Sequence, residues 1–485
     1  MTRRRAALDL VVVLAIAVAM LLPALWNGYP FVFSDTGEYL ARADVLTVPA
    51  YRTVGYSVWI ALMGARTTLW ATAAAQSLLL AALLAILARA LVPRLPRAAL
   101  VAGGAAIAIF TAASTRASQI MPDVFAPVLV LSLYLLVAAW DRLGTIARSI
   151  AVFGVLSSVV MHVTHVAIAV ALVVVYAVGA AVGGGTTGRW RAVARGALCV
   201  AIGTGALLTY NFSQTRRLFI AQNGHVFILS HLVDSGLASR LLREECPHGA
   251  HYDLCPYVGM LDINGRTPTP DEFVWNPSSP LYRIGGWEGS RRESARILRG
   301  TLHRYPFTHA LDLVSYTLDQ LSAISTLDGL ESYARISWVD GRIRQLRPQD
   351  YPSMHSARQQ TGTLGFDDLA RVHDLLARLA AAASVWLLYR HHARRDPAAL
   401  GAIDGFHRTV WFALIGNAVL CGNLSGVYAR YQARLVWLLP LAILLSVAAW
   451  RWPEVDEPQE PQEPPSGGER VPAATARSTV MDAVV

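Results

Sequence analysis

Long runs of apolar residues constrain this chain more than any other feature of its sequence. A helix that crosses a bilayer needs about 20 mostly apolar residues. Ten segments come close to that length, namely 8–26, 69–90, 98–114, 123–140, 146–161, 163–183, 193–211, 373–390, 408–426 and 433–450. Charged residues make up only 15% of the chain, against about 25% in an ordinary soluble domain. The sequence therefore predicts an all-α polytopic membrane protein with about ten transmembrane helices.

The first apolar run admits two interpretations. Because the run follows the basic residues of MTRRR, the first interpretation is a cleaved signal peptide. The run is long for the apolar part of a signal peptide, however. Pro23, Trp26 and Asn27 stand where a cleavage site made of small residues is needed. We therefore expect a first helix that is retained.

Arginine residues at the loop ends predict the orientation, because cytoplasmic loops of membrane proteins carry an excess of basic residues. With the N-terminus in the cytoplasm, five cytoplasmic loops are rich in arginine, and the short outer loops carry little. Representatives of the five loops are Arg4, Arg94, Arg142, Arg191 and Arg394. The net charge of +9 then reflects orientation and not binding of nucleic acid.

Polar stretches divide the chain into regions. Residues 1–211 form a predicted N-terminal transmembrane core, which includes a first outer loop at 27–68. Residues 212–370 are too polar to span a membrane and form a predicted outer region. Residues 371–451 hold the C-terminal transmembrane helices. The tail 452–485 contains the sequence EPQEPQEPP, whose composition predicts a disordered cytoplasmic segment.

Cys246 and Cys255 stand in the outer region, in the sequence CPHGAHYDLC. Two cysteines so close together in an oxidising compartment indicate a disulfide. Cys199 and Cys421 fall inside apolar runs instead, where a free cysteine packs as a small apolar side chain.

Two shorter apolar stretches predict helices at the membrane surface. The segment 54–65 has the length of a half-helix. The segment 304–326 has apolar residues at helical spacing, as in a helix that lies along the surface. The polar stretch 340–368 has no helical or strand periodicity from which a structure could be assigned.

The first outer loop carries acidic residues in the sequence VFSDTGEYLARAD. Asp35 and Glu38 are three residues apart, so on a helix they share a face. A carboxylate beside an apolar wall can serve as a general base. The alternative is a helix N-cap, in which Ser34 or Asp35 caps a short helix and Glu38 lies in its first turn. In the predicted orientation, every polar cluster near a membrane edge falls on the outer side.

The order of these motifs resembles the GT-C superfamily of polyprenyl-phosphate-dependent membrane glycosyltransferases. Within it, the chain looks like the branch of bacterial aminoarabinose transferases and protein O-mannosyltransferases. Many members have D-x-x-x-Y in the first outer loop, then R-x-P-G-Y-P, then a helix with Gln near its outer end. The matching residues here are Asp35, Tyr39, Arg52, Gly55, Tyr56 and Gln76. The chain departs from the pattern at Val54 and Ser57, where proline is usual.

Three later stretches also resemble family segments. QIMPDVFAPVLVLSLYLL is similar to a segment in which an acidic residue, here Asp123, opens a helix. VLSSVVMHVTHVAIAVAL places His162 or His165 where many members have Lys or Arg. GVYARYQARLVWLLPLAILL is similar to the closing helix and supplies Arg430, Tyr431 and Arg434.

Each of these residues also has a structural interpretation. Asp123 favours the positive end of a helix. The two histidines are at a spacing that can bind metal, but no cysteine or acidic residue is near in sequence. Arg430 and Arg434 can bind phosphate through the planar fork of guanidinium donors. In the alternative, their side-chain stems lie in lipid at the membrane edge and their guanidinium groups reach water.

The resemblance implies transfer of a sugar from a polyprenyl phosphate to a periplasmic acceptor, with inversion and with Asp35 as base. The acceptor is a lipid, a polysaccharide or a protein. The implied substrate-binding residues are Glu38, Tyr39, Arg52, Tyr56, Asp123, His162, His165, Arg430 and Tyr431. For Arg52, the alternative is an ion pair with Asp35 or Glu38 that orders the loop. A divalent metal beside Glu38 is left open, and no other cofactor is implied. The implied location is the bacterial inner membrane, with the N-terminus in the cytoplasm.

Two alternatives belong to other classes of protein. A transporter or flippase for a lipid-linked saccharide has the same polar edge, but usually also ionisable groups at mid-span and repeated halves. A non-catalytic assembly protein would bind a partner through 212–370. Convergence of Asp35, Asp123 and Arg430 in one cavity favours the enzyme over both.

Overall fold

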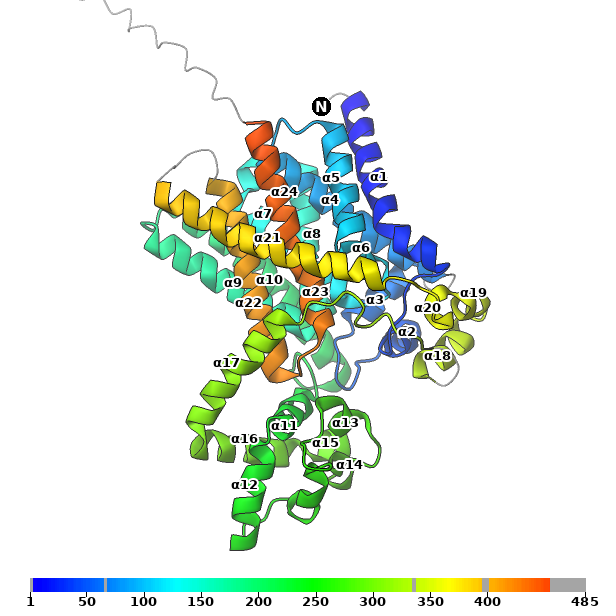
Figure 1. The fold of residues 1–485 in the computed structure, drawn as a ribbon, viewed down its shortest axis with the longest axis vertical. Helices are drawn as coiled ribbons and strands as arrows, with labels where there is room; N and C mark the ends of the chain where they lie inside the picture. Colours follow the sequence, from blue (N-terminus) through cyan, green and yellow to red (C-terminus); the bar gives the residue numbers. More distant parts are fainter. Residues whose placement is uncertain (1–2, 65–67, 334–336, 395–400, 454–485) are drawn as a thin grey trace, which may run out of the picture.

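The computed structural model describes residues 3–64, 68–333, 337–394 and 401–453. Across these ranges the regular elements are helices, as predicted, and β-pairing is limited to isolated bridges. A bundle of membrane-type helices forms the main body, and a smaller helical unit extends from one end of it (Figure 1).

Six described helices are long and apolar enough to cross a membrane. They are α1 (Arg3–Asn27), α4 (Leu69–Leu91), α9 (Val163–Val182), α10 (Thr187–Thr215), α21 (Asp367–Arg394) and the consecutive pair α23 (Ala429–Val436) and α24 (Leu438–Arg451). Shorter apolar helices are α5 (Arg97–Phe110), α7 (Phe125–Ala138) after the turn η1 (Pro122–Val124), and α8 (Thr145–Met161). α22 (Gly401–Leu424) covers most of the predicted span 408–426. The count of ten spans stays a prediction.

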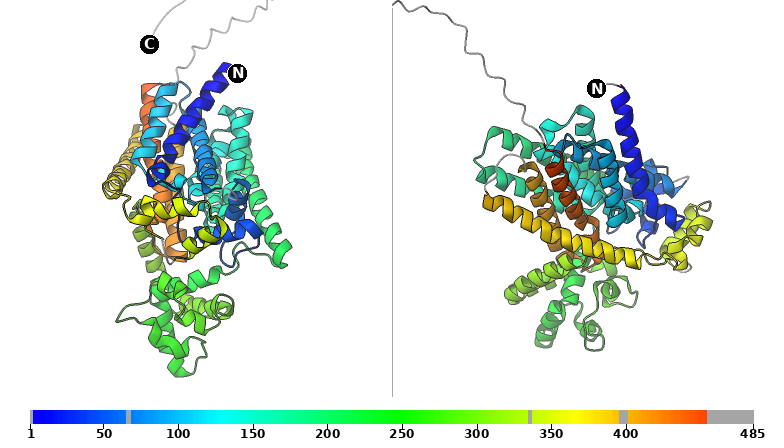
Figure 2. Two further views of the ribbon diagram at one scale, coloured as in Figure 1. Left: turned by 90° about the vertical axis from the view of Figure 1, so that its right-hand side faces the viewer. Right: turned by 45° about the horizontal axis from the view of Figure 1, so that its top comes forward.

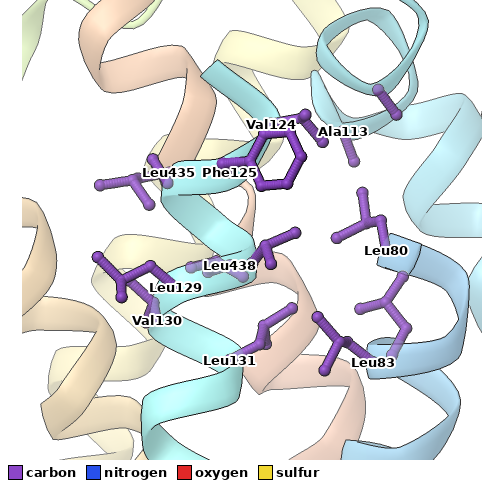
Figure 3. Packing of buried hydrophobic residues seen from close by; sticks show 14 of the residues in the cluster. Leu80, Leu83, Ala113, Val124, Phe125, Leu129, Val130, Leu131, Leu435 and Leu438 are labelled. Carbon is purple, nitrogen blue, oxygen red and sulfur yellow. The ribbon is translucent and has the colours of Figure 1, made fainter. Parts of the chain in front are cut away.

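The core of the bundle surrounds α7, which is apolar on all sides, as is typical of a buried helix. Figure 3 shows side chains of α7 packed together with those of α4 and of the α23–α24 pair. The labelled residues of this packing are Leu80, Leu83, Phe125, Leu129, Val130, Leu131, Leu435 and Leu438. α7 therefore holds η1, and with it Asp123, at a fixed depth in the bundle.

The predicted span 98–114 does not continue as one helix. α5 ends at Phe110, and the backbone is extended at Thr111 before α6 (Ala113–Ser118) begins. The Thr111 hydroxyl donates a hydrogen bond of 2.6 Å to the carbonyl of Ile107, and the Ser118 hydroxyl donates one of 2.9 Å to the carbonyl of Met20. Since these two bonds, one local and one to α1, satisfy buried polar groups, the chain can turn inside the bundle.

The 212–370 segment forms two parts. The first is a compact unit with its own apolar core, which lies beyond the end of the bundle opposite the N-terminus (Figure 2). Its elements are α11 (Gly224–Asp234), α12 (Leu237–Glu245), η3 (Cys246–His248), η4 (Cys255–Leu261), α13 (Pro270–Trp275), α14 (Pro280–Arg283), α15 (Gly286–Gly289) and α16 (Arg291–Arg304). Cys246 and Cys255 form the predicted disulfide. Cys199 and Cys421 are free and buried, as expected.

The second part returns to the bundle. Its elements are α17 (Pro306–Ser322), α18 (Trp338–Leu346), α19 (Tyr351–Ser356) and α20 (Arg358–Thr361), so much of the stretch 340–368 is helical. α17 packs on α22 and exposes an apolar face that includes Phe307, Leu311, Val314 and Leu318. α18 packs on α2 (Thr36–Val45), which precedes the half-helix α3 (Gly55–Leu62).

We expect His231 to make the stability of the compact unit α11–α16 (Gly224–Arg304), called the outer unit from here on, depend on pH. Its ring is 8% exposed and lies 4.6 Å from the ring of Tyr316. Burial, reinforced by His309, lowers the pKa of His231 to about 4. The unfolded chain therefore takes up this proton first, and as the pH falls from about 6.5 to 4 the unit loses up to about 3 kcal/mol of stability.

We expect His231→Phe, which keeps a ring against Tyr316, to remove this pH dependence. Urea unfolding followed by tryptophan fluorescence at pH 4.5 and 7 measures the effect. An unchanged dependence in the variant would assign it to another group.

Candidate functional site

A cavity of about 820 Å³ lies where the bundle meets the outer unit. That volume is within the range of about 300–1,000 Å³ typical of small-molecule sites. Of the residues predicted for the site, the cavity is lined by Asp35, Glu38, Arg52, Asp123, His162, Arg430 and Tyr431. The structure therefore brings together residues from the first loop, η1, the start of α9 and α23. Tyr39, Tyr56 and His165 do not line the cavity.

Asp35 is held by a fork of two contacts from Arg52. The Nη1 and Nη2 atoms of Arg52 each lie 2.5 Å from a different carboxylate oxygen of Asp35. Asp35 occupies the N-cap position of α2, but its side chain makes no capping hydrogen bond. The carboxylate is thus oriented by Arg52 and not by the helix. Since each carboxylate oxygen accepts more than one hydrogen bond, Asp35 keeps accepting capacity toward the cavity.

Aromatic rings hold Arg52 in place. Its guanidinium lies 4.9 Å from the ring centre of Tyr51 and 5.4 Å from that of Tyr39. The Tyr39 ring is 5.0 Å from that of Tyr56, whose hydroxyl donates a hydrogen bond of 2.6 Å to Gln76. Tyr39 and Tyr56 therefore support the Asp35–Arg52 pair from behind the cavity wall.

Arg430 presents a guanidinium to the cavity. It lies 4.2 Å from the ring centre of Phe33 and 5.0 Å from that of Tyr431, whose hydroxyl is 3.4 Å from Nη2. The backbone N–H of Arg430 donates to Asp328 at 2.7 Å. Its side chain forms no ion pair with any residue that the structure describes. An anion in the cavity therefore meets a guanidinium that is near the carboxylates of Asp35 and Asp123 but is not engaged in a direct ion pair with them.

Arg434 behaves differently from Arg430. It is 1% exposed, and its Nη1 lies 3.0 Å from Oδ1 of Asp123. Its Nη2 donates to Asn417 at 2.7 Å and to Thr164 at 3.3 Å. Arg434 is thus not an interfacial side chain that reaches water. Its pairing with Asp123 joins α23 to η1 and fixes one wall of the cavity.

The two histidines lie at the start of α9, with ring centres 5.5 Å apart. His162 is the N-cap residue, and its Nδ1 accepts a hydrogen bond from the N–H of Thr164. His165 is fully buried, with Nδ1 2.9 Å from the carbonyl of Ser158. Within the described residues, no group of three or more His, Cys, Asp or Glu side chains is arranged to hold a metal ion. The described residues therefore offer no cluster of side-chain ligands for the divalent metal that the resemblance left open.

Several lining residues are not among those predicted from the sequence. They include the acidic residues Asp271, Asp328 and Glu331 and the aromatic residues Tyr51, Phe227, Trp275 and Trp338. Most come from 212–370, where polar and aromatic residues are common and carry no periodic signal. Only the folding of this segment back over the first loop places them in the cavity.

No protein-family model, curated protein or solved structure matches the chain significantly. The resemblance to the GT-C superfamily therefore stays a prediction from short motifs.

Proposed function

We propose that this protein is a membrane glycosyltransferase that moves a sugar from a polyprenyl-phosphate donor to an acceptor on the outer side of the membrane. One observation carries the proposal. A single cavity holds the oriented carboxylate of Asp35, the guanidinium of Arg430 without an ion-pair partner, and an apolar wall made by membrane helices. A base, a phosphate site and a lipid path are the three parts that this reaction needs.

The apolar wall supports a lipid donor. Val163 and Ala167 of α9 line the cavity. Val170, Val174 and Val178 follow at helical spacing and are each at least half exposed. A stripe at this spacing lies on one face of a helix, so an apolar strip leads from the cavity along the outer surface of α9. The tail of the donor lies along this strip while its phosphate stays in the cavity.

The proposed reaction is a single displacement. The acceptor hydroxyl oxygen attacks the anomeric carbon, and a new carbon–oxygen bond forms there. The bond from that carbon to the donor phosphate breaks, and its electron pair stays on the phosphate oxygen beside Arg430. The hydroxyl proton goes to Asp35. One base is sufficient because phosphate leaves as a stable anion, whereas hydrolases use two carboxylates. Attack opposite the phosphate inverts the configuration.

The arrangement of the helices supports the predicted orientation. The N-terminus and the outer unit lie at opposite ends of the bundle (Figure 1). We propose ten spans, made by the six long apolar helices, the three shorter ones and α22. The cavity then opens on the periplasmic side of a bacterial inner membrane, and the N-terminus is cytoplasmic.

A transfer assay tests the proposal. The purified protein is placed in liposomes with a panel of radiolabelled polyprenyl-phosphate sugars and with a cell-envelope extract that supplies lipid, polysaccharide and protein acceptors, and label leaving the lipid is followed. We expect transfer by the wild type and a rate about 10²–10³-fold lower in Arg430→Gln, because a charge-stabilising donor is lost. Arg430→Lys should recover part of the rate, since it keeps the charge but not the fork.

Arg451→Gln is the matched control, because Arg451 is exposed at the end of α24, outside the cavity. It should leave the rate unchanged. Absence of transfer with every donor, in a preparation that moves these lipids between leaflets, would replace the enzyme by the transporter.

A further inference from the structure

A cluster of aromatic rings lies where the outer unit meets the first loop. The ring of Tyr51 stacks on that of Trp287, with centres 4.7 Å apart and planes inclined by 23°. Trp275 lies 5.4 Å from both Tyr51 and Trp287. Tyr51 and Trp275 line the cavity, while Trp287 lies behind them. Trp275 is 43% exposed, so packing between the two parts leaves much of this side chain free.

Trp338 adds a second aromatic surface from a different element. It stands at the start of α18, lines the same cavity and is 53% exposed. The Trp338 ring lies against Gly37. A side chain at position 37 would clash with it, because a Cβ built there would be 2.8 Å from the ring. The glycine between Asp35 and Glu38 therefore allows this ring to approach the loop that carries the proposed base.

The aromatic surfaces lie next to the proposed base. Tyr51 precedes Arg52, and its ring lies 4.9 Å from the guanidinium that holds Asp35. A molecule stacked on Trp275, whose ring lies 5.4 Å from that of Tyr51, therefore lies on the acceptor side of the reaction, apart from the α9 strip proposed for the donor tail.

Carboxylates line the cavity beside these rings. Glu38, Asp271 and Glu331 come from three separate segments of the chain, and all three line the cavity. Carboxylate oxygens accept hydrogen bonds from hydroxyl groups. Flat apolar ring faces beside several acceptors suit a ligand with an apolar face and many hydroxyl groups.

We infer that the acceptor is a saccharide that stacks on Trp275 and Trp338 and donates hydroxyl hydrogen bonds to the neighbouring carboxylates. Its role as acceptor rests on the proposed glycosyltransferase function. A sugar ring presents a face of C–H groups, which complements the negative face of an aromatic ring. One common way to bind an extended peptide, along the free edge of a sheet, is excluded here. The described residues contain no strand to supply one.

Binding without donor tests the inference separately from transfer. The full-length protein in lipid nanodiscs is titrated with maltotriose, cellotetraose, chitotriose and mannotriose, and with a serine-rich peptide. Saturation-transfer NMR and tryptophan fluorescence report binding. We expect the wild type to bind at least one saccharide more tightly than the peptide. Trp275→Ala and Trp338→Ala should each weaken that binding by about ten-fold.

Two further variants separate stacking from folding. Trp275→Phe keeps a ring and should retain most of the binding. Trp450→Ala removes a tryptophan that is 80% exposed at the end of α24, outside the cavity, and should change nothing. Absence of saccharide binding, equal binding by Trp275→Ala, or preference for the peptide would overturn the inference.

The transfer assay then distinguishes the two proposals. Sugar transfer to an acceptor without saccharide binding leaves the glycosyltransferase and overturns the saccharide site. Saccharide binding without transfer from any lipid donor overturns the glycosyltransferase, and with it the role of this site as the acceptor site.

Discussion

Asp35→Asn should lower the rate of sugar transfer by about 10²–10⁴-fold, the usual contribution of a general base. Asparagine has nearly the shape of aspartate, and its amide oxygen still accepts a hydrogen bond from Arg52. It cannot take up the acceptor proton under these conditions. The loss should therefore appear in the rate of transfer, measured with saturating donor, while donor binding is retained.

Glu38→Gln is the matched control for this prediction. Glu38 also lines the cavity, one turn along α2, but its carboxylate is paired with Arg42 at 2.9 Å. We expect a change of less than about ten-fold, because this carboxylate contacts the acceptor without taking its proton. A rate in Asp35→Asn within ten-fold of the wild type would remove Asp35 as the base and leave the transferase itself in place.

Removal of one partner of the Asp123–Arg434 pair should destabilise the protein more than any surface change. Asp123 is 5% exposed and Arg434 is 1% exposed. Arg434→Met leaves a buried carboxylate without its closest counter-ion, which typically costs about 3–5 kcal/mol. The protein is unfolded by heat in detergent, and a fluorogenic maleimide reports unfolding by labelling the thiols of Cys199 and Cys421 as they become exposed. The shift in the unfolding midpoint measures the loss of stability.

Two comparisons make this prediction specific. The double variant Asp123→Leu/Arg434→Met should be more stable than Arg434→Met, because it leaves no unpaired charge. Arg371→Met breaks the exposed pair of Arg371 with Asp368 and should cost less than about 1 kcal/mol. A double variant no more stable than Arg434→Met would mean that the hydrogen bonds of Arg434 to Asn417 and Thr164 matter more than the ion pair.

Much of the fold follows from local properties of the sequence. The apolar runs predict α1, α4, α9, α10 and α21, because apolar length is a property of consecutive residues. The disulfide of Cys246 with Cys255 follows from two close cysteines in a polar segment. Local bonds can still divide an apolar run, as the Thr111 hydroxyl does after α5.

The candidate site is only partly predictable in this way. Motif spacing leads to Asp35, Arg52 and Arg430, which all line one cavity. The aromatic residues Trp275 and Trp338 were not predicted, since they lie in a segment without periodicity. Their meeting with the first loop depends on contacts such as the close approach of Trp338 to Gly37.

The amino-acid sequence was thus sufficient to predict an all-α chain with membrane-type helices and the positions of most long helices, because both depend on the apolarity of neighbouring residues. The partners of Asp123, Arg430 and Arg434 were decided by tertiary structure alone. Asp123 and Arg434 are 311 residues apart in sequence, and Arg430 and Arg434 are one helical turn apart. Yet Arg434 is paired and buried, while Arg430 faces the cavity, because ion pairing depends on distances and burial that only the packed helices create.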